Sequence, residues 1–325
     1  MTAVSSEFDI IRRYFTRPTH RAILGIGDDA ALIPYTETHD LAVSNDSLVA
    51  DQHFFADTDS GKLGHKALAV NLSDMAAMGA APRWVSLALT LPTKLSMNSN
   101  WLEAFADGFF TLANQYQIEL IGGDTTCGPL NIGVQIMGEV TKGKALKRSG
   151  AMPDDDIWIS GQLGNAALAL AHLQHQITLV PEELAVCLPA LHTPLARIEL
   201  GQQLIDLAHS AIDVSDGLLA DLGHILESSH VGATIHLEKI PCSWVMQRYL
   251  SQSGAVNCLL AGGDDYELCF TAPEIKRSEI IQLSQELAVP LTWIGKITQG
   301  KELLILDSNG NSITQEKKGY EHFLT

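Results

Sequence analysis

One short stretch, Ala211–Leu219, constrains the fold of this chain more than any other. Its apolar residues predict a buried strand, and the glycine that follows predicts a turn into a helix. The turn has the pattern Asp-x-Ser-Asp-Gly, which crowds Asp213, Ser215 and Asp216 together. Carboxylates this close repel each other unless a cation or a hydrogen-bond donor offsets their charge. The stretch therefore predicts a place where metal and phosphate meet, at the end of a buried strand.

Segments with strand and helix patterns alternate along the rest of the chain, which predicts an α/β or α+β protein. Strands are expected at residues 22–26, 41–46, 84–91, 118–121, 131–140, 157–160, 233–237, 266–271, 291–297 and 302–306. Helices are expected at residues 5–15, 62–78, 101–116, 164–174, 196–208 and 278–287, and from Gly217 to about Glu227. The polar, glycine-containing stretch 141–153 predicts a boundary between two domains, 1–142 and 150–325.

The composition is that of a soluble globular protein. The 325 residues, 46% of them hydrophobic, can bury one large core or two domains of ordinary size. A formal charge of −17 argues against a general binder of nucleic acid or anionic membrane. No targeting segment and no run of eighteen apolar residues is found, so a cytoplasmic protein is expected. The five cysteines lack any Cys-x-x-Cys pair and suggest neither a disulfide framework nor a zinc site.

Aspartates recur at glycine turns and predicted strand ends. They are Asp28, Asp29, Asp46, Asp74, Asp124, Asp213, Asp216, Asp264 and Asp265. A single aspartate of this kind is most often a helix cap or a turn former. If half of the set converged, each close pair would repel by ~4 kcal/mol at an effective dielectric of ~20, and the site would need cations. Oxygen ligands without His or Cys favour Mg²⁺ or Mn²⁺ over zinc.

Two familiar nucleotide motifs are matched only in part. Gly25, Gly27 and Ala30 fit the Gly-x-Gly-x-x-Ala fingerprint of dinucleotide-binding proteins, but Asp28 and Asp29 fall where the pyrophosphate would lie. The two near-matches to a Walker A loop, which start at residues 138 and 295, lack its Ser or Thr and open no convincing helix. Use of ATP would therefore depend on aspartate-bound metal and on glycine amides such as those of Gly122–Gly123.

Six ordered motifs resemble those of the thiamine-monophosphate kinase family, within the aminoimidazole ribonucleotide synthetase superfamily. They are Gly25–Ala31, Asn71–Gly79, Gly122–Thr126, Asp213–Leu218, Gly262–Leu268 and Lys318–Phe323, and they span nearly the whole chain. The resemblance implies a two-domain α/β fold and a homodimer whose N-terminal domains pair through their sheets. It implies transfer of the γ-phosphoryl group of ATP to thiamine monophosphate, which gives thiamine diphosphate and ADP. Domain 1–142 would bind metal and ATP and form the dimer, and domain 150–325 would complete the site.

The resemblance also implies roles for individual residues. Several Mg²⁺ ions would be held by Asp29, Ser44, Asn45, Asp46, Asp74, Asp124, Asp213 and Asp216. ATP would be contacted by Gly123, Asp124, Arg148 and Ser215. Thiamine monophosphate would be contacted by His53, Asp264 and Tyr320. No residue is expected to act as a general base, since the acceptor phosphate, with a second pKa of ~6, is already mostly ionised at pH 7.

The sequence departs from the family pattern at three positions. Asn45 stands where Thr is common, which is tolerable if the backbone carbonyl makes the contact. Asp264 stands where Glu is common, which shortens a substrate contact by one methylene, and nothing is inferred from Cys127. Sister activities of the superfamily, a metal-dependent phosphohydrolase and a non-catalytic metal-binding protein are the alternatives. The kinase interpretation requires that the fold bring Asp213 near Asp74.

Overall fold

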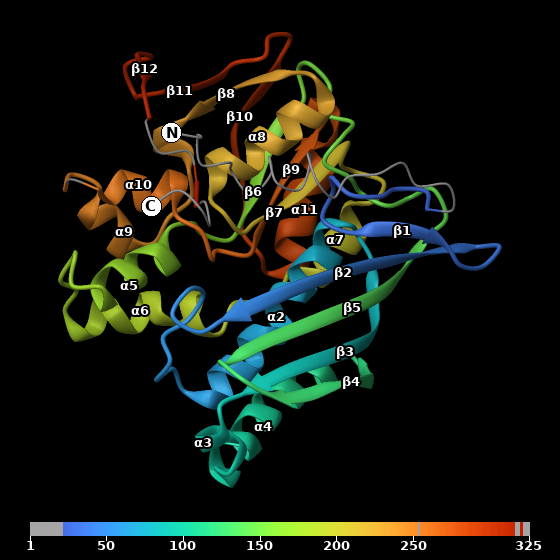
Figure 1. Cartoon of the computed structure of the whole chain (residues 1–325). Coiled ribbons are helices and arrows are strands. Elements are labelled where there is room, and N and C mark those ends of the chain that lie inside the picture. Colours follow the sequence, from blue (N-terminus) through green and yellow to red (C-terminus); the bar gives the residue numbers. More distant parts are fainter. Residues whose placement is uncertain (1–21, 253, 316–318, 321–325) are drawn as a thin grey trace, which may run out of the picture.

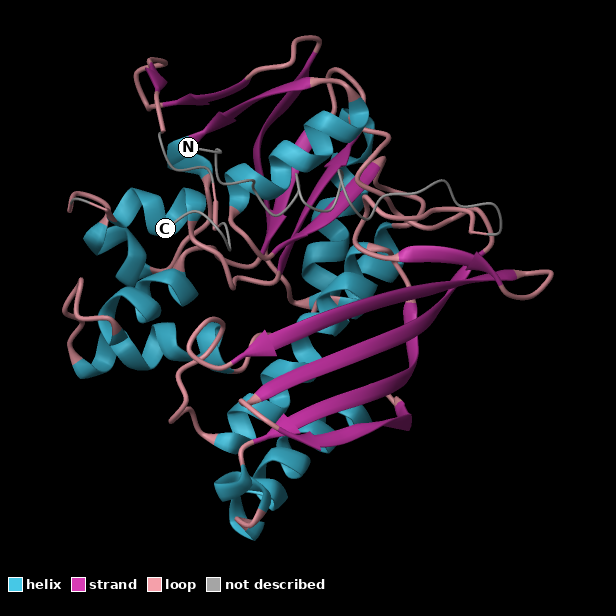
Figure 2. Ribbon diagram, in the orientation of Figure 1, coloured by secondary structure: helices cyan, strands magenta, loops and turns pink. Residues whose placement is uncertain are grey.

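Two β-sheets with helices packed against them make up most of the molecule (Figures 1 and 2). The computed structural model describes residues 22–252, 254–315 and 319–320. The helix expected at residues 5–15 lies outside the described residues. Strands and helices alternate along the described chain, so the predicted mixed α/β architecture is confirmed.

The first sheet has five strands in the order β1-β2-β5-β3-β4. They are β1 (Ala31–Pro34), β2 (His39–Val49), β3 (Ala81–Leu91), β4 (Glu119–Cys127) and β5 (Asn131–Thr141). Buried and more exposed residues alternate along β5, where Ile132, Val134 and Ile136 are buried. A period of two places these side chains on one face of the sheet. Helices lie behind that face in Figure 1 and cover it.

Helix α2 (Ser60–Ala77) is the central element of the fold. It packs on the first sheet, on α4 (Ser99–Gln115), and on α7 (Ile198–Leu204) and β7 (Ser210–Val214) of the second half. Glycines let α2 and α4 approach closely: a Cβ atom at Gly64 would lie 2.0 Å from the carbonyl oxygen of Phe105, and one at Gly108 1.9 Å from that of Gly61. Because α2 touches both sheets, its side chains can reach a site built by both halves.

The second sheet has seven strands in the order β12-β11-β8-β10-β6-β9-β7. Besides β7, they are β6 (Asp156–Ser160), β8 (Gly232–His236), β9 (Glu267–Ala272), β10 (Leu291–Thr298), β11 (Leu303–Leu306) and β12 (Ser312–Ile313). Every residue of β6, β7 and β9 is buried. The remaining helices are α3 (Thr93–Ser96), α5 (Asn165–Leu173), α6 (Pro181–His192), α8 (Leu218–Ser229), α9 (Trp244–Tyr249), α10 (Ala255–Ala261) and α11 (Arg277–Leu287).

The structure corrects the sequence prediction in two places. The strand expected at residues 22–26 is absent, and only Leu24 forms an isolated bridge, with Leu32. The backbone of Gly27, at φ 125°, instead turns the chain back, and the strand begins at Ala31. The sequence does not predict helices α3, α6, α9 and α10, because they are short or contain a proline and so show little periodicity.

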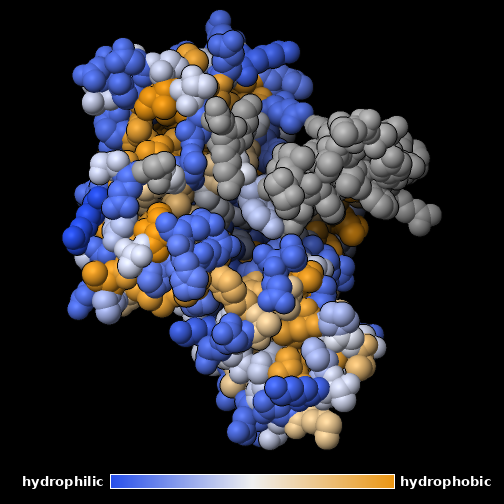
Figure 3. All heavy atoms as spheres, turned by 60° about the vertical axis from the view of Figure 1, so that its left-hand side comes forward, coloured by the Kyte–Doolittle hydropathy of each residue, from blue (hydrophilic) through white to orange (hydrophobic). Residues whose placement is uncertain are grey.

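The visible surface in Figure 3 is mostly polar, with apolar side chains gathered in patches, including one on the lower part of the molecule. That part holds the first sheet (Figure 1). Large apolar side chains exposed on its elements include Phe110, Leu120 and Ile121, the last two on β4. Among the described residues, no helix combines the length and hydrophobicity needed to cross a lipid bilayer.

Candidate functional site

A cleft of ≈ 1060 Å³ opens between the two halves of the molecule. Its walls come from β2 and the loop after it, from α2 and α5, from the turn after β7, and from the turn at residues 262–264. Most of the residues singled out from the sequence line it: Asp29, Ser44, Asn45, Asp46, His53, Asp74, Arg148, Asp213, Ser215, Asp216, Asp264 and Tyr320. Gly123 and Asp124 do not.

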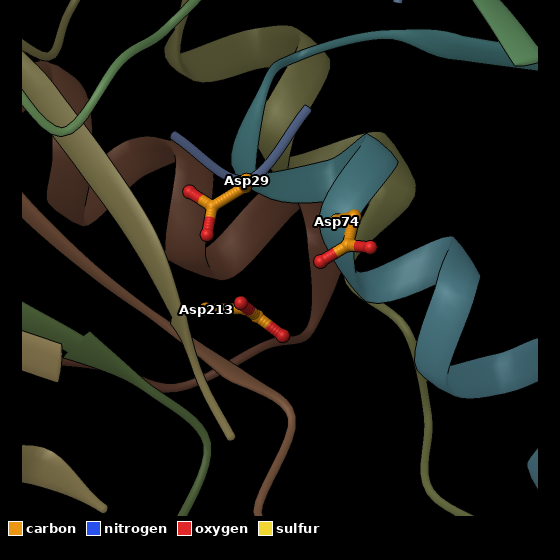
Figure 4. Close-up of side chains that lie close together, drawn as sticks. All are labelled: Asp29, Asp74 and Asp213. Atoms are coloured by element: carbon orange, nitrogen blue, oxygen red, sulfur yellow. The ribbon is translucent and has the colours of Figure 1, made fainter. Parts of the chain in front are cut away.

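Three aspartates from distant segments meet in this cleft. Asp29 comes from the segment before β1, Asp74 from the last turn of α2, and Asp213 from β7 (Figure 4). Each offers a carboxylate oxygen within 4.8 Å of the others. The prediction that the fold brings Asp213 near Asp74 is therefore confirmed.

The carboxylates of the cleft are crowded and partly removed from water. Burial, followed by the charge of Asp29, raises the pKa of Asp213 to about 8. Burial and Asp29 likewise raise the pKa of Asp46 to about 6. Burial and then Asp46, Asp213 and Asp29 raise the pKa of Asp74 well above its usual value. In all three, burial is the main cause of the raised pKa, and the neighbouring carboxylates add to it.

Arg148 is the cationic side chain nearest to this cluster. Its guanidinium forms hydrogen bonds with one of the two carboxylate oxygens of Asp29. Its Nε and Nη2 donate to Oδ1 of Asp29, at 3.2 and 2.6 Å, and its backbone N–H donates to the carboxylate of Asp28. The other oxygen of Asp29, Oδ2, is buried and has no hydrogen-bond partner among the described residues. A buried carboxylate oxygen without a partner is costly, and a cation would satisfy it. An all-oxygen donor set suits Mg²⁺.

The polar run on β2 is tied to α2. Ser44 Oγ donates to Oδ2 of Asp74 at 2.5 Å, and the backbone N–H of Asp46 donates to Oδ1 of Asn71 at 3.3 Å. Strand alternation places the side chains of Ser44 and Asp46 on one face and that of Asn45 on the other. Asn45 is correspondingly exposed while its neighbours are half-buried.

A buried aspartate holds the Ser215–Gly217 turn. Oδ2 of Asp221 accepts the backbone N–H groups of Ser215, Asp216 and Gly217, at 3.1, 3.1 and 3.0 Å. Asp221 is not among the residues predicted from the sequence. The sequence feature that could have identified Asp221 is an acidic residue in the first turn of the helix after a glycine, where acidic side chains often bind free backbone N–H groups.

The two adjacent aspartates of the Gly-Gly-Asp-Asp turn have different surroundings. Asp264 faces the cleft with its backbone at φ 70°, and it accepts a hydrogen bond from Tyr266 Oη at 2.9 Å. Asp265 is buried and accepts the backbone N–H of Gly164, at 3.0 and 2.9 Å, where α5 begins. Asp265 therefore caps a helix, which is the commonest role of an aspartate at a glycine turn.

Two further residues expected at the substrate also line the cleft. His53 Nδ1 accepts the backbone N–H of Val49 at 3.0 Å, so Nε2 carries the proton in the neutral ring. The backbone N–H of Tyr320 donates to the carbonyl of Asp216 at 3.0 Å, which places Tyr320 beside the Ser215–Gly217 turn.

Gly123 and Asp124 lie on β4, an edge strand whose nine residues are all exposed. In the register of the sheet, Gly123 pairs with Leu87, Leu87 with Val134, and Val134 with Asp46. Gly123 is thus three strands away from Asp46, or roughly 14 Å at the usual strand spacing. Within one chain, the fold does not bring this motif to the carboxylate cluster.

Models of one protein family match both halves of the chain. The N-terminal domain model of the AIR synthase related proteins matches residues 27–140, and the C-terminal domain model matches residues 153–306. The thiamine-monophosphate kinase of Escherichia coli (strain K12) is 47% identical over 323 residues, which cover 98% of each chain. That of Bacillus subtilis (strain 168) is 34% identical and covers 98% of this chain and 99% of its own.

Solved structures resemble the chain over most of its length. A thiamine-monophosphate kinase from Stenotrophomonas maltophilia K279a has a TM-score of 0.80 at 45% identity, over 90% of this chain and 92% of that one. AaThiL complexed with AMPPCP and TMP has a TM-score of 0.83 at 28% identity, over 98% and 97%. Hydrogenase maturation protein HypE, at 21% identity and a TM-score of 0.71, shares the fold alone.

Proposed function

This chain belongs to the thiamine-monophosphate kinases of the AIR synthase related family, and we propose that its inter-domain cleft carries out their reaction with the aid of Mg²⁺. The enzyme phosphorylates thiamine monophosphate with ATP as the co-substrate. The family and the two-domain α/β fold predicted from the sequence are thereby confirmed. The metal, the roles of the site residues, the domain limits, the homodimer and a cytoplasmic location remain parts of the proposal.

The observation that carries the proposal is the meeting of Asp29, Asp74 and Asp213, with one oxygen of Asp29 left without a partner. In one chain, Mg²⁺ ions would be held by Asp29, Ser44, Asn45, Asp46, Asp74, Asp213 and Asp216, with Asn45 using its backbone carbonyl. Bound there, Mg²⁺ would neutralise phosphate charge and favour in-line transfer of the phosphoryl group. The chain supplies the positions of these ligands, which α2, β2 and β7 fix.

The other residues would bind and orient the two substrates. Arg148 and Ser215 would contact ATP, and Asp221 would hold Ser215 in place through the backbone of its turn. His53, Asp264 and Tyr320, which also line the cleft, would contact thiamine monophosphate. Since the acceptor phosphate is mostly ionised at pH 7, no residue has to remove a proton, and catalysis consists of positioning and charge stabilisation.

Gly123 and Asp124 would act from a second copy of the chain. Open edges among the described strands of the first sheet include β4 along its whole length, and β2 over residues 44–49, because β1 pairs only with residues 40–43. Unpaired edges readily pair with another chain. If β4 of one copy lay against residues 44–49 of the other, the partner's Asp124 would lie beside Ser44 and Asp46, and the arrangement would repeat by two-fold symmetry.

An assay with and without the acceptor tests the proposed reaction. The protein is incubated with Mg²⁺ and ATP, alone or with thiamine monophosphate, and the products are separated by chromatography. We expect thiamine diphosphate and ADP in equal amounts, only when the acceptor is present, and no product with excess EDTA. Phosphate released without acceptor would instead identify a phosphohydrolase, and Mg²⁺ binding without turnover would identify a non-catalytic metal-binding protein.

A further inference from the structure

A buried lysine lies in the cleft, on α2. Lys62, Lys66, Val70 and Asp74 recur every four residues and all line the cleft, so one face of the helix borders it over three turns. At a rise of 1.5 Å per residue, Lys66 lies about 12 Å along the helix from Asp74. The face thus runs from the carboxylate cluster to a cationic end.

Lys66 contacts the segment expected at the acceptor. Its Nζ lies 3.0 Å from Oδ1 of Asp264, and only 4% of its side chain is exposed. Asp264 is itself fixed, because its backbone N–H donates to the carbonyl of Ser215 at 2.8 Å. Lys66 therefore contacts the Gly-Gly-Asp-Asp turn, which is itself hydrogen-bonded to the Ser215–Gly217 turn.

The ion pair by itself is a poor reason for a lysine to be here. Removing the Lys66 ammonium from water is costly, and the Asp264 carboxylate, whose side chain is 28% exposed and so partly hydrated, offsets that cost only in part. An ammonium also has three donors, and the described residues give Lys66 one ion pair. Of the other lysine and arginine side chains that line the cleft, Arg148 is paired with Asp29, and Lys62 is exposed.

We propose that Lys66 binds the phosphate group of thiamine monophosphate, a role that rests on the proposed function. That phosphate carries a charge of about −1.5 to −2 at pH 7 and must approach a cleft lined by carboxylates. The Nζ donors would offset part of this charge next to Asp264, whose turn is hydrogen-bonded to the Ser215–Gly217 turn, so the acceptor phosphate would face the phosphoryl group of ATP. Asp264 holds the ammonium in place, and the two side chains together present one charge of each sign to a ligand that carries both a thiazolium and a phosphate.

Ligands with and without the phosphate test this contact. Binding of thiamine monophosphate and of thiamine is measured by calorimetry for the wild-type enzyme and for Lys66→Met, Lys66→Arg and Lys144→Met. Lys144 is the matched control, because it forms a 2.7 Å pair with Asp206 outside the cleft. We expect Lys66→Met to weaken thiamine monophosphate roughly 10- to 100-fold, as for loss of a charged hydrogen bond, and to leave thiamine within about 2-fold. Lys66→Arg should recover part of the loss, and Lys144→Met should show none.

Kinetics give a second readout. The KM for thiamine monophosphate should rise in Lys66→Met while the KM for ATP stays within about 2-fold of the wild type, since Arg148 and Ser215, and not Lys66, would contact ATP. Equal weakening of thiamine and thiamine monophosphate would overturn the proposal, because it would mean that Lys66 only orients Asp264. A rise confined to the KM for ATP would overturn it as well.

A further pair of variants guards against misfolding. Asp264→Asn and the double variant Lys66→Met/Asp264→Asn differ only in the ammonium, and the double variant leaves no unpaired charge in the cleft wall. The double variant should bind thiamine monophosphate, but not thiamine, more weakly than Asp264→Asn; equal binding of thiamine monophosphate by the two would refute the contact. If the wild-type enzyme made no thiamine diphosphate, the proposed function would fail instead, so the two failures are distinguishable.

Discussion

Strands β7 and β4 each carry a site aspartate, yet their surroundings are opposite. All five residues of β7 are buried, between β9 on one side and helices α8 and α2 that pack against it. All nine residues of β4 are exposed at the edge of the first sheet. Asp213 on β7 meets Asp29 and Asp74 inside one chain, whereas Asp124 on β4 meets none of them. The difference shows that one chain builds the carboxylate cluster and leaves a second set of predicted ligands on an open edge.

The largest effect is expected from Asp213→Asn. It removes a carboxylate from the cluster and should lower kcat/KM by roughly 10²- to 10³-fold, as for loss of one group that stabilises transition-state charge. The Mg²⁺ concentration needed for half-maximal activity should rise. Steady-state kinetics across a Mg²⁺ titration measure both, with Asp206→Asn, a surface aspartate paired with Lys144, as the control. Near-normal turnover would remove Asp213 from the metal site.

A second test asks whether Asp124 works across the dimer. Asp124→Asn alone should lower activity by roughly 10²-fold, because it also removes a carboxylate from the proposed metal site. It should likewise raise the Mg²⁺ concentration needed for half-maximal activity. In an equal mixture of the two variants, about a quarter of the sites should regain all their residues, because half of the dimers pair one chain of each kind. Activity is measured before and after subunit exchange. A mixture as inactive as either variant would show that Asp124 acts within its own chain.

A third test asks whether the dimer forms through the exposed edge of β4. Ile121→Lys places a charge on β4, where 58% of the native side chain is exposed in one chain, and should turn dimers into monomers. Activity should fall by at least about 10-fold, since each site would lose its partner residues, while the melting temperature of the monomer changes little. Sedimentation measures the mass. Leu304→Lys, on the second sheet at 41% exposure, should stay dimeric and active.

The smallest effect is expected from His53→Ala, which changes a proposed contact to thiamine monophosphate made within one chain. His53→Ala removes an Nε2–H donor and should raise the KM for thiamine monophosphate by roughly 3- to 10-fold, the value of a neutral hydrogen bond. The KM for ATP should not change and serves as the internal control. An acceptor KM equal to that of the wild type would contradict the assignment of His53. This test does not depend on the dimer, so His53→Ala should raise the KM for thiamine monophosphate by the same factor in the wild-type and Ile121→Lys backgrounds.

Local patterns predicted most of the elements and many of the cleft residues. Strands β2, β3, β5 and β9 and helices α2, α4 and α11 lie within a few residues of their expected positions, because their periodicity is strong. The segment at 22–26 failed because its apolar run is too short to outweigh the glycine turn that follows. Lys66 and Asp221 were missed, since one looks like a surface lysine of a helix and the other like any acidic residue in a first turn.

Local sequence is enough to predict that aspartates follow strands and glycine turns, because strand ends and turns depend on residues a few positions apart. Which of these aspartates meet depends on the tertiary fold. Asp264 faces the cleft and pairs with Lys66, whereas its neighbour Asp265 caps α5, and periodicity cannot separate two adjacent residues in a turn. Likewise, whether a strand is buried like β7 or open like β4 depends on pairing between segments far apart in the chain, which local sequence does not specify.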